Sequence, residues 1–157
     1  MTVFEVFVVG IGACAVFDVW QRIFQRLTAI PPSDWSIVGR WSLGVVIKGK
    51  LIAHDIESQT KIQHETAIGW MVHYGIAVCY AAVFNILISS GIVTANVTDG
   101  LSFGVISVLI PWFFFFPCLG KGMMARRTSN PLLACFLALM MHSLFGVSIG
   151  LGFQFLN

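Results

Sequence analysis

The sequence predicts an all-α, polytopic membrane protein with four transmembrane helices, and three observations predict this class. First, 57% of the 157 residues are hydrophobic and only 10% are charged, whereas a soluble domain carries roughly a quarter charged residues. Second, four stretches are apolar over the length of a bilayer. Third, all nine basic residues fall in two segments of the chain. We expect residues 1–157 to form a single membrane domain.

A helix crosses the bilayer core with about 20 largely apolar residues. Four stretches meet this requirement, namely 3–24, 66–92, 101–119 and 131–156. Asn130 followed by Pro131 predicts a helix start, because asparagine is a good N-cap and proline suits the first helical position. Pro111 and Pro117 predict a kink in the third stretch. No basic residue precedes the first stretch, as one would in a secretory signal, so we expect that stretch to stay in the mature protein.

The positions of the basic residues predict the orientation. They lie at the end of the first span and in the loop after it, or in the loop between the third and fourth spans: Arg22, Arg26, Arg40, Lys48, Lys50, Lys61, Lys121, Arg126 and Arg127. With four spans these two loops share one side of the membrane. Because loops rich in lysine and arginine stay in the cytoplasm, we expect a bacterial inner-membrane protein with both termini in the periplasm.

The segment 34–48 of the first loop has the pattern of an amphipathic helix. Its polar stripe recurs every four residues: Ser36, Arg40, Gly44 and Lys48. Trp35 and Trp41 lie on another face, and tryptophan is enriched at headgroup depth. We expect this helix to lie in the cytoplasmic interface. A re-entrant hairpin, bent at Gly39 and Gly44, is the alternative.

Ionisable residues inside the spans are candidates for a functional site, because a charge is expensive at membrane depth. Asp18, His73 and His142 lie roughly 10, 10 and 17 Å from the cytoplasmic ends of their spans, at about 1.5 Å per residue. Each shares a helix face with small residues, as His142 does with Gly146 and Gly150, and such faces pack against other helices. We expect the three side chains to meet in the inner half of the membrane.

The leading hypothesis is a polar site in the cytoplasmic half of the bilayer, in a metal-dependent enzyme that acts on a lipid-like substrate. Four residues are the expected catalytic groups: Asp18, Glu65, His73 and His142. Together with His54 they offer the ligand types that hold zinc or iron. A bound metal would activate water, with one carboxylate as the base. Basic residues of the loops are candidates for binding the substrate or an anionic lipid headgroup: Arg40, Lys121, Arg126 and Arg127.

Three other functions fit the same residues. Asp18 and the histidines would form the proton relay of a small transporter or permease, which we expect to be a homo-oligomer because four short helices enclose little space. His73 and His142 lie on helices that run in the same direction, which suits bis-histidine haem ligation. In a non-catalytic partner protein, the polar layer would only specify helix packing. The four cysteines follow no zinc-ligand spacing and are expected to be free, and no nucleic-acid motif is present.

Short motifs along nearly the whole chain carry a resemblance to a known family. They are, in order, Gly10-x-Gly12-Ala13, Asp18-x-Trp20, Val38-Gly39-Arg40-Trp41, Glu65 through Gly69-Trp70-x-x-His73-Tyr74, Pro117-x-x-Gly120-x-Gly122, Thr128-x-Asn130-Pro131 and His142-x-x-Phe145-Gly146. With them the chain resembles the bacterial inner-membrane proteins of domain of unknown function 2938. The run from Phe113 to Phe116 departs from that pattern, where a more polar residue is expected before Pro117. The resemblance implies a small polytopic membrane protein and carries no activity with it.

Overall fold

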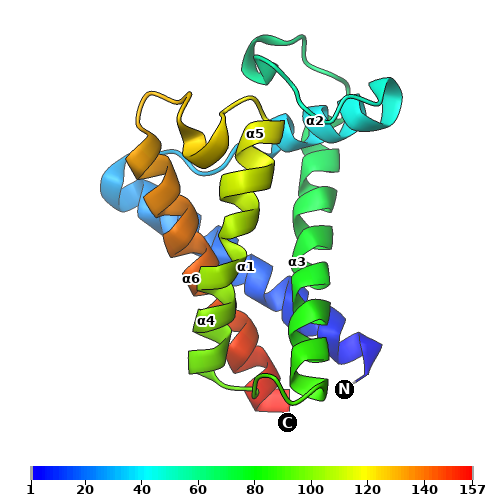
Figure 1. Ribbon diagram of the computed structural model, residues 1–157, viewed down its shortest axis with the longest axis vertical. Coiled ribbons are helices and arrows are strands. Elements are labelled where there is room, and N and C mark those ends of the chain that lie inside the picture. The colour runs from blue at the N-terminus through cyan, green and yellow to red at the C-terminus, as the bar shows by residue number, and fades with distance from the viewer. Residues whose placement is uncertain (1, 157) are drawn as a thin grey trace. The chain divides into compact units, whose positions relative to one another are not determined.

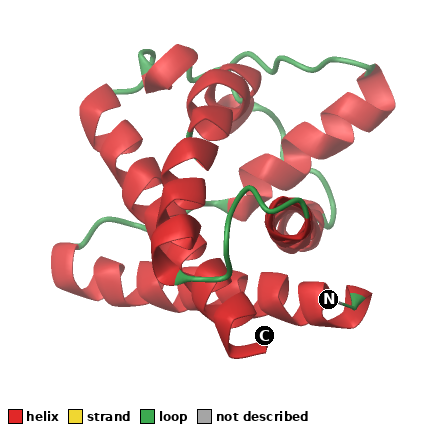
Figure 2. Cartoon of the chain, turned by 60° about the horizontal axis from the view of Figure 1, so that its bottom comes forward, coloured by secondary structure: helices red, strands yellow, loops and turns green. Residues whose placement is uncertain are grey.

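The structure is a computed structural model that describes residues 2–156. Over these residues the chain forms helices and loops and no strand (Figure 2). Four segments are long and apolar enough to cross a membrane: α1 (Val3–Thr28), α3 (Glu65–Ser89), the segment Val97–Cys118 and α6 (Pro131–Leu156). The prediction of an all-α protein with four membrane-length helices is therefore confirmed.

Local capping explains where the helices begin and end. Thr2 and Glu5 form a capping box at the start of α1, which satisfies free backbone N–H groups of the first turn. The Asp99 N–H donates to the side chain of Asn96 at 2.9 Å, and the third crossing begins at Val97, one turn before the start expected at about residue 101. The predicted cap of α6 is confirmed, because the Leu133 N–H donates to Asn130 Oδ1 at 3.1 Å.

The chain divides into two compact units, which are described separately. The core unit comprises Met1–Ser33, Tyr74–Ser107 and Leu139–Asn157. The loop unit comprises Asp34–His73 and Val108–Ala138. Helices α3 and α6 and the third crossing each contribute residues to both units.

The core unit is held together by apolar side chains from α1, α3 and α6. The most completely buried of them are Cys14, Ala81, Phe84, Ile149 and Phe153. Large apolar side chains also cover the outer faces of the helices, with Phe4 of α1 74% exposed, as expected for surfaces that meet lipid. In Figure 1, the start of α1, the end of α3, the start of α4 (Val97–Ser107) and the end of α6 lie at the same end of this unit.

In the loop unit, α2 (Trp35–Lys48) forms where the amphipathic helix was predicted. Asp34 caps it by accepting from the Ser36 N–H at 2.9 Å. The helix runs unbroken through Gly39 and Gly44, so the hairpin alternative is not formed. A Cβ atom added at Gly39 would lie less than 3.0 Å from the backbone of α3. The two helices therefore cross in direct backbone contact, which only glycine permits.

The third crossing is interrupted as its prolines predicted. After α4 it passes through a π-helix, Pro111–Phe115, and a short turn, α5 (Phe116–Cys118). Neither Pro111 nor Pro117 has an N–H with which to close an α-helical turn. The chain accommodates this with a wider turn, in which the Phe116 N–H donates to the carbonyl of Pro111.

Candidate intramembrane site

A close helix crossing in the core unit positions the first candidate site. Gly100 and Gly104 of α4 face Gly146 and Gly150 of α6, and a Cβ atom added at Gly100, Gly104 or Gly146 would lie less than 3.0 Å from the opposite backbone. Facing pairs of glycines at a spacing of four let two helices approach until their backbones touch. This approach brings Ser107, which follows Gly104 on α4, within hydrogen-bond distance of His142 on α6.

The contact between Ser107 and His142 defines the state of the imidazole. Ser107 Oγ lies 2.8 Å from His142 Nδ1, and the same hydroxyl donates to the carbonyl of Gly104 at 2.7 Å. A serine hydroxyl has one hydrogen, and a carbonyl oxygen can only accept. We therefore assign the Ser107 hydrogen to the Gly104 carbonyl and the imidazole hydrogen to Nδ1, which donates to Ser107. His142 Nε2 is left as an acceptor.

An aromatic ring of a third helix also packs against His142. The Tyr80 ring of α3 meets the imidazole edge-to-face at 6.0 Å between ring centroids. Tyr80 also packs edge-to-face against Phe103 of α4 and Phe145 of α6. An imidazole fixed by a hydrogen bond at one nitrogen can accept a proton or bind a metal ion at the other nitrogen.

Asp18 occupies a second polar position in the core unit. Its carboxylate accepts a hydrogen bond from the Tyr74 hydroxyl at 2.9 Å. This contact joins α1 to α3, whose backbones approach closely where Gly10 meets Val78. The Cys14 thiol, one turn earlier on α1, is buried and lies within 4.8 Å of an Asp18 carboxylate oxygen.

Asp18 and His142 contact α3 on different faces. Their partners on that helix, Tyr74 and Tyr80, are six residues apart, which corresponds to a rise of about 9 Å and a rotation of about 240°. The structure thus gives each of the two predicted site residues a tyrosine partner of its own on α3.

The remaining predicted ligands lie in the loop unit. The His73 ring stacks on Trp35 at 3.7 Å between ring centroids and meets Trp70 edge-to-face at 5.8 Å. His54 is exposed, and its carbonyl accepts from the Gln59 side chain at 3.0 Å. Both environments are formed by the segment between α1 and α3 and by the first turns of α3.

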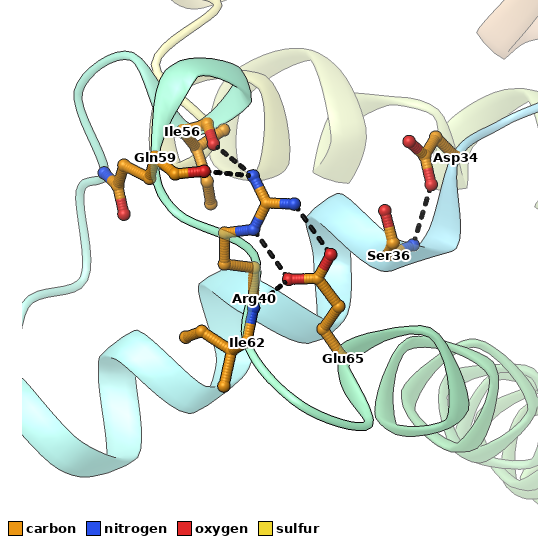
Figure 3. Close-up of polar contacts among 7 residues, drawn as sticks. All are labelled: Asp34, Ser36, Arg40, Ile56, Gln59, Ile62 and Glu65. Atoms are coloured by element: carbon orange, nitrogen blue, oxygen red, sulfur yellow. Dashed lines mark hydrogen bonds and ion pairs between the residues drawn. The ribbon is translucent and has the colours of Figure 1, made fainter.

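Glu65 and Arg40 form a buried ion pair with each other (Figure 3). Arg40 Nε and Nη2 donate to the two carboxylate oxygens, each at 2.7 Å. Arg40 Nη1 also donates to the carbonyls of Ile56 and Gln59, while the Glu65 carboxylate accepts from the Ile62 N–H. The hydrogen bonds to Glu65 raise the pKa of Arg40 above its ordinary value. This geometry ties the loop after α2 to the start of α3.

The other basic candidates lie at the loop surface. Lys121 Nζ is 3.4 Å from a carboxylate oxygen of Glu57. Arg126 and Arg127 are exposed, and no ion pair involves either of them within residues 2–156. They are therefore available to an external anion.

Sequence reasoning did not pair the residues of the His142 site. Ser107 and Tyr80 were visible as polar residues inside spans, but nothing in their spacing linked them to His142. The signal that could have found Ser107 is Gly100-x-x-x-Gly104, which matches Gly146-x-x-x-Gly150 and is followed by Ser107 one turn later. Two matching motifs would have predicted that α4 and α6 pack together.

Four membrane-length helices that carry polar residues inside their spans define a multi-pass membrane protein. Over residues 7–153 the chain matches the family described as "Protein of unknown function (DUF2938)", and it belongs to that family, as the motif resemblance predicted. No curated protein and no solved structure matches the chain.

Proposed function

We propose that this is an inner-membrane protein with periplasmic termini, and that His142 is the acid–base group of an intramembrane site acting on a lipid-like substrate. One observation carries the proposal: the hydrogen bond between His142 Nδ1 and Ser107, which assigns the acceptor role to Nε2 near the middle of α6. Polar groups at this depth are expensive and mark functional sites. The location is proposed from the positive-inside distribution of the basic loops.

The hydrogen bond between Ser107 and His142 supports general base catalysis by the imidazole. His142 Nε2 accepts a proton from a hydroxyl of the substrate, and the oxygen that loses the proton becomes the nucleophile. The imidazolium so formed still donates from Nδ1 to Ser107, whose hydroxyl donates on to the Gly104 carbonyl. Zinc and iron are bound by thiolate, imidazole and carboxylate ligands. In the core unit the Cys14 thiol and the Asp18 carboxylate, which lie within 4.8 Å of each other, would hold such an ion.

The test compares lipid extracts, by mass spectrometry, from cells that lack the gene and carry wild-type protein, His142→Ala or Ser107→Ala. We expect His142→Ala to behave like the empty strain and Ser107→Ala to restore the lipid change only partly. Ser148→Ala is the matched control, because its hydroxyl bonds only a carbonyl of its own helix. If His142→Ala protein is scarce but fully active per molecule, the residue is structural and the proposal fails. Zinc and iron analysis of purified protein tests the metal.

The hydrogen bond between Asp18 and Tyr74 favours a second candidate, a proton-coupled transporter. A carboxylate inside a span, stabilised by a hydroxyl from another span, is a proton-binding site. In vesicles with a trapped pH dye, a transported solute would change the internal pH, and Asp18→Asn would abolish that change. An enzyme acting on lipid would alter the lipid composition without moving protons across the membrane.

A further inference from the structure

The face of α2 that packs against α3 is covered along its first half only. Gly39 and Arg40 are buried there, and Gly39 contacts the α3 backbone. Val46 and Ile47 follow them by seven residues, which is nearly two helical turns, so each lies on the same face about 10 Å further along. Yet Val46 is 82% exposed and Ile47 is 69% exposed. The packing face of α2 therefore continues beyond α3 as an open apolar surface, and Figure 1 shows the end of α2 extending past the start of α3.

The turn that follows α2 enlarges this apolar surface. Gly49 ends the helix in the left-handed conformation, with φ of 63°. Trp41 Nε1 donates to the Leu51 carbonyl at 2.7 Å, so the chain turns back and Leu51 lies beside the helix. Leu51 and Ile52 are 48% and 53% exposed. Large aliphatic side chains are thus exposed at both ends of the segment 46–52, which we call the α2 tip.

The contact between α2 and α3 sets the depth of the α2 tip. Gly39 meets α3 at Glu65 and Gly69, which lie in the first two turns of that helix. Because α3 is long and apolar enough to cross a membrane, we expect its first turns at the boundary between headgroups and hydrocarbon. An exposed apolar patch marks an interaction surface, and one at this depth fits the lipid beside α3.

Two lysines make the α2 tip positively charged. Lys48 lies in the last turn of α2 and Lys50 in the turn after it, and both are exposed. Within residues 2–156 neither of them forms an ion pair, and the segment 46–52 contains no acidic residue. A lysine stem can lie along apolar surface while its ammonium group reaches the headgroups. Lysines next to a membrane surface attract anionic lipids.

We propose that the α2 tip is a surface that binds anionic phospholipids of the leaflet on the loop side. Its aliphatic side chains lie among the upper acyl chains, and Lys48 and Lys50 contact the phosphate groups. This surface differs from the polar stripe of the sequence, which combined Arg40 with Lys48, because Arg40 is buried against Glu65. The proposal concerns the loop unit alone and does not depend on the role of His142.

The first test locates the α2 tip in the membrane, with full-length wild-type protein in nanodiscs of phosphatidylglycerol and phosphatidylcholine. The readouts are the isoleucine methyl resonances of Ile47 and Ile52, with Ile56 of the same unit, only 2% exposed, as the buried reference. We expect a lipid with a nitroxide high on its acyl chain to broaden Ile47 and Ile52 several-fold more than Ile56, and a water-soluble gadolinium chelate to spare them. The reverse pattern would show a water-facing surface suited to a protein partner and would overturn the proposal.

The second test identifies the lipid class by comparing trace nitroxide-labelled phosphatidylglycerol with equally labelled phosphatidylcholine. We expect the anionic label to broaden Ile47 several-fold more, whereas Ile106, which is 66% exposed on the third crossing, should respond equally to both labels. The double variant Lys48→Gln, Lys50→Gln should abolish the difference at Ile47. Lys61→Gln is the matched control, an exposed lysine of the same loop outside the α2 tip, and should preserve it. Equal broadening of wild-type Ile47 by both labels, or a preference that survives the double variant, would overturn the proposal.

Discussion

Ser107 determines which nitrogen of His142 can accept a proton. Because its hydroxyl donates to the Gly104 carbonyl, we assign the imidazole hydrogen to Nδ1 and the lone pair to Nε2. We predict that ¹⁵N spectra of wild-type protein show the Nδ1–H tautomer of His142. In Ser107→Ala the imidazole loses its acceptor, and the two tautomers should become mixed. A wild-type spectrum with the hydrogen on Nε2 would contradict the assignment.

The buried ion pair between Arg40 and Glu65 should contribute to the thermal stability of the protein. Their side chains are only 4% and 7% exposed, and removing one partner leaves a buried charge without compensation. We predict that Glu65→Gln and Arg40→Gln each lower the apparent Tm in detergent by several degrees or more. Arg40→Lys should restore little, because an ammonium cannot make the paired contacts of a guanidinium.

The control for the ion pair is Arg126→Gln, which removes an exposed charge and should leave the Tm unchanged. Equal melting of Glu65→Gln and wild-type protein would mean that the pair adds no stability, and Glu65 would again be a candidate for chemistry.

The candidate site could be predicted from the sequence only in part. Asp18 and His142 could be identified because an ionisable residue inside an apolar span stands out whatever its neighbours are. Their partners could not be predicted, since Tyr74 lies 56 residues from Asp18 and Ser107 lies 35 residues from His142. Such contacts depend on which helices pack together, and helical periodicity does not contain that information.

At the scale of the elements, two glycine crossings determine how the helices pack. A Cβ atom at Gly104 or Gly39 would lie less than 3.0 Å from the backbone of the opposite helix, whereas Gly12 and Gly75 have open space beside them. We predict that Gly104→Ala and Gly39→Ala destabilise the protein by about 1–3 kcal/mol, the usual range for overpacking. Gly12→Ala and Gly75→Ala should be neutral or stabilising by up to about 1 kcal/mol.

Unfolding in mixed micelles measures all four glycine variants under the same conditions. If Gly104→Ala and Gly12→Ala proved equally stable, α4 and α6 would not be in backbone contact, and the position of Ser107 beside His142 would be lost with that contact.

The elements themselves were largely predictable. Apolar runs of bilayer length located the four crossings, and the four-residue polar stripe located α2, because both patterns follow from helix geometry alone. The ends were less predictable: the third crossing starts at Val97 because of a side-chain cap at Asn96. The π-helix was foreseen only as a kink, since two prolines exclude a regular α-helix without specifying what replaces it.

For the whole molecule, one physical constraint determines most of the architecture. Backbone N–H and C=O groups have no water to bond in the hydrocarbon core, so the chain crosses as helices that satisfy these groups internally. The same constraint makes composition and charge sufficient to predict the class and the span count. It does not determine how the crossings pack, which depends on small-residue contacts such as those of Gly104 and Gly146.

The orientation of the molecule yields the last prediction. All basic residues lie in or beside the loops after the first and third crossings, and basic loops are retained in the cytoplasm. A reporter that is active only in the periplasm should therefore be active when fused after Asn157 and inactive when fused after Lys121. A reporter that is active only in the cytoplasm should give the opposite pattern at both sites. Activity of the cytoplasmic reporter after Asn157 would reverse the orientation.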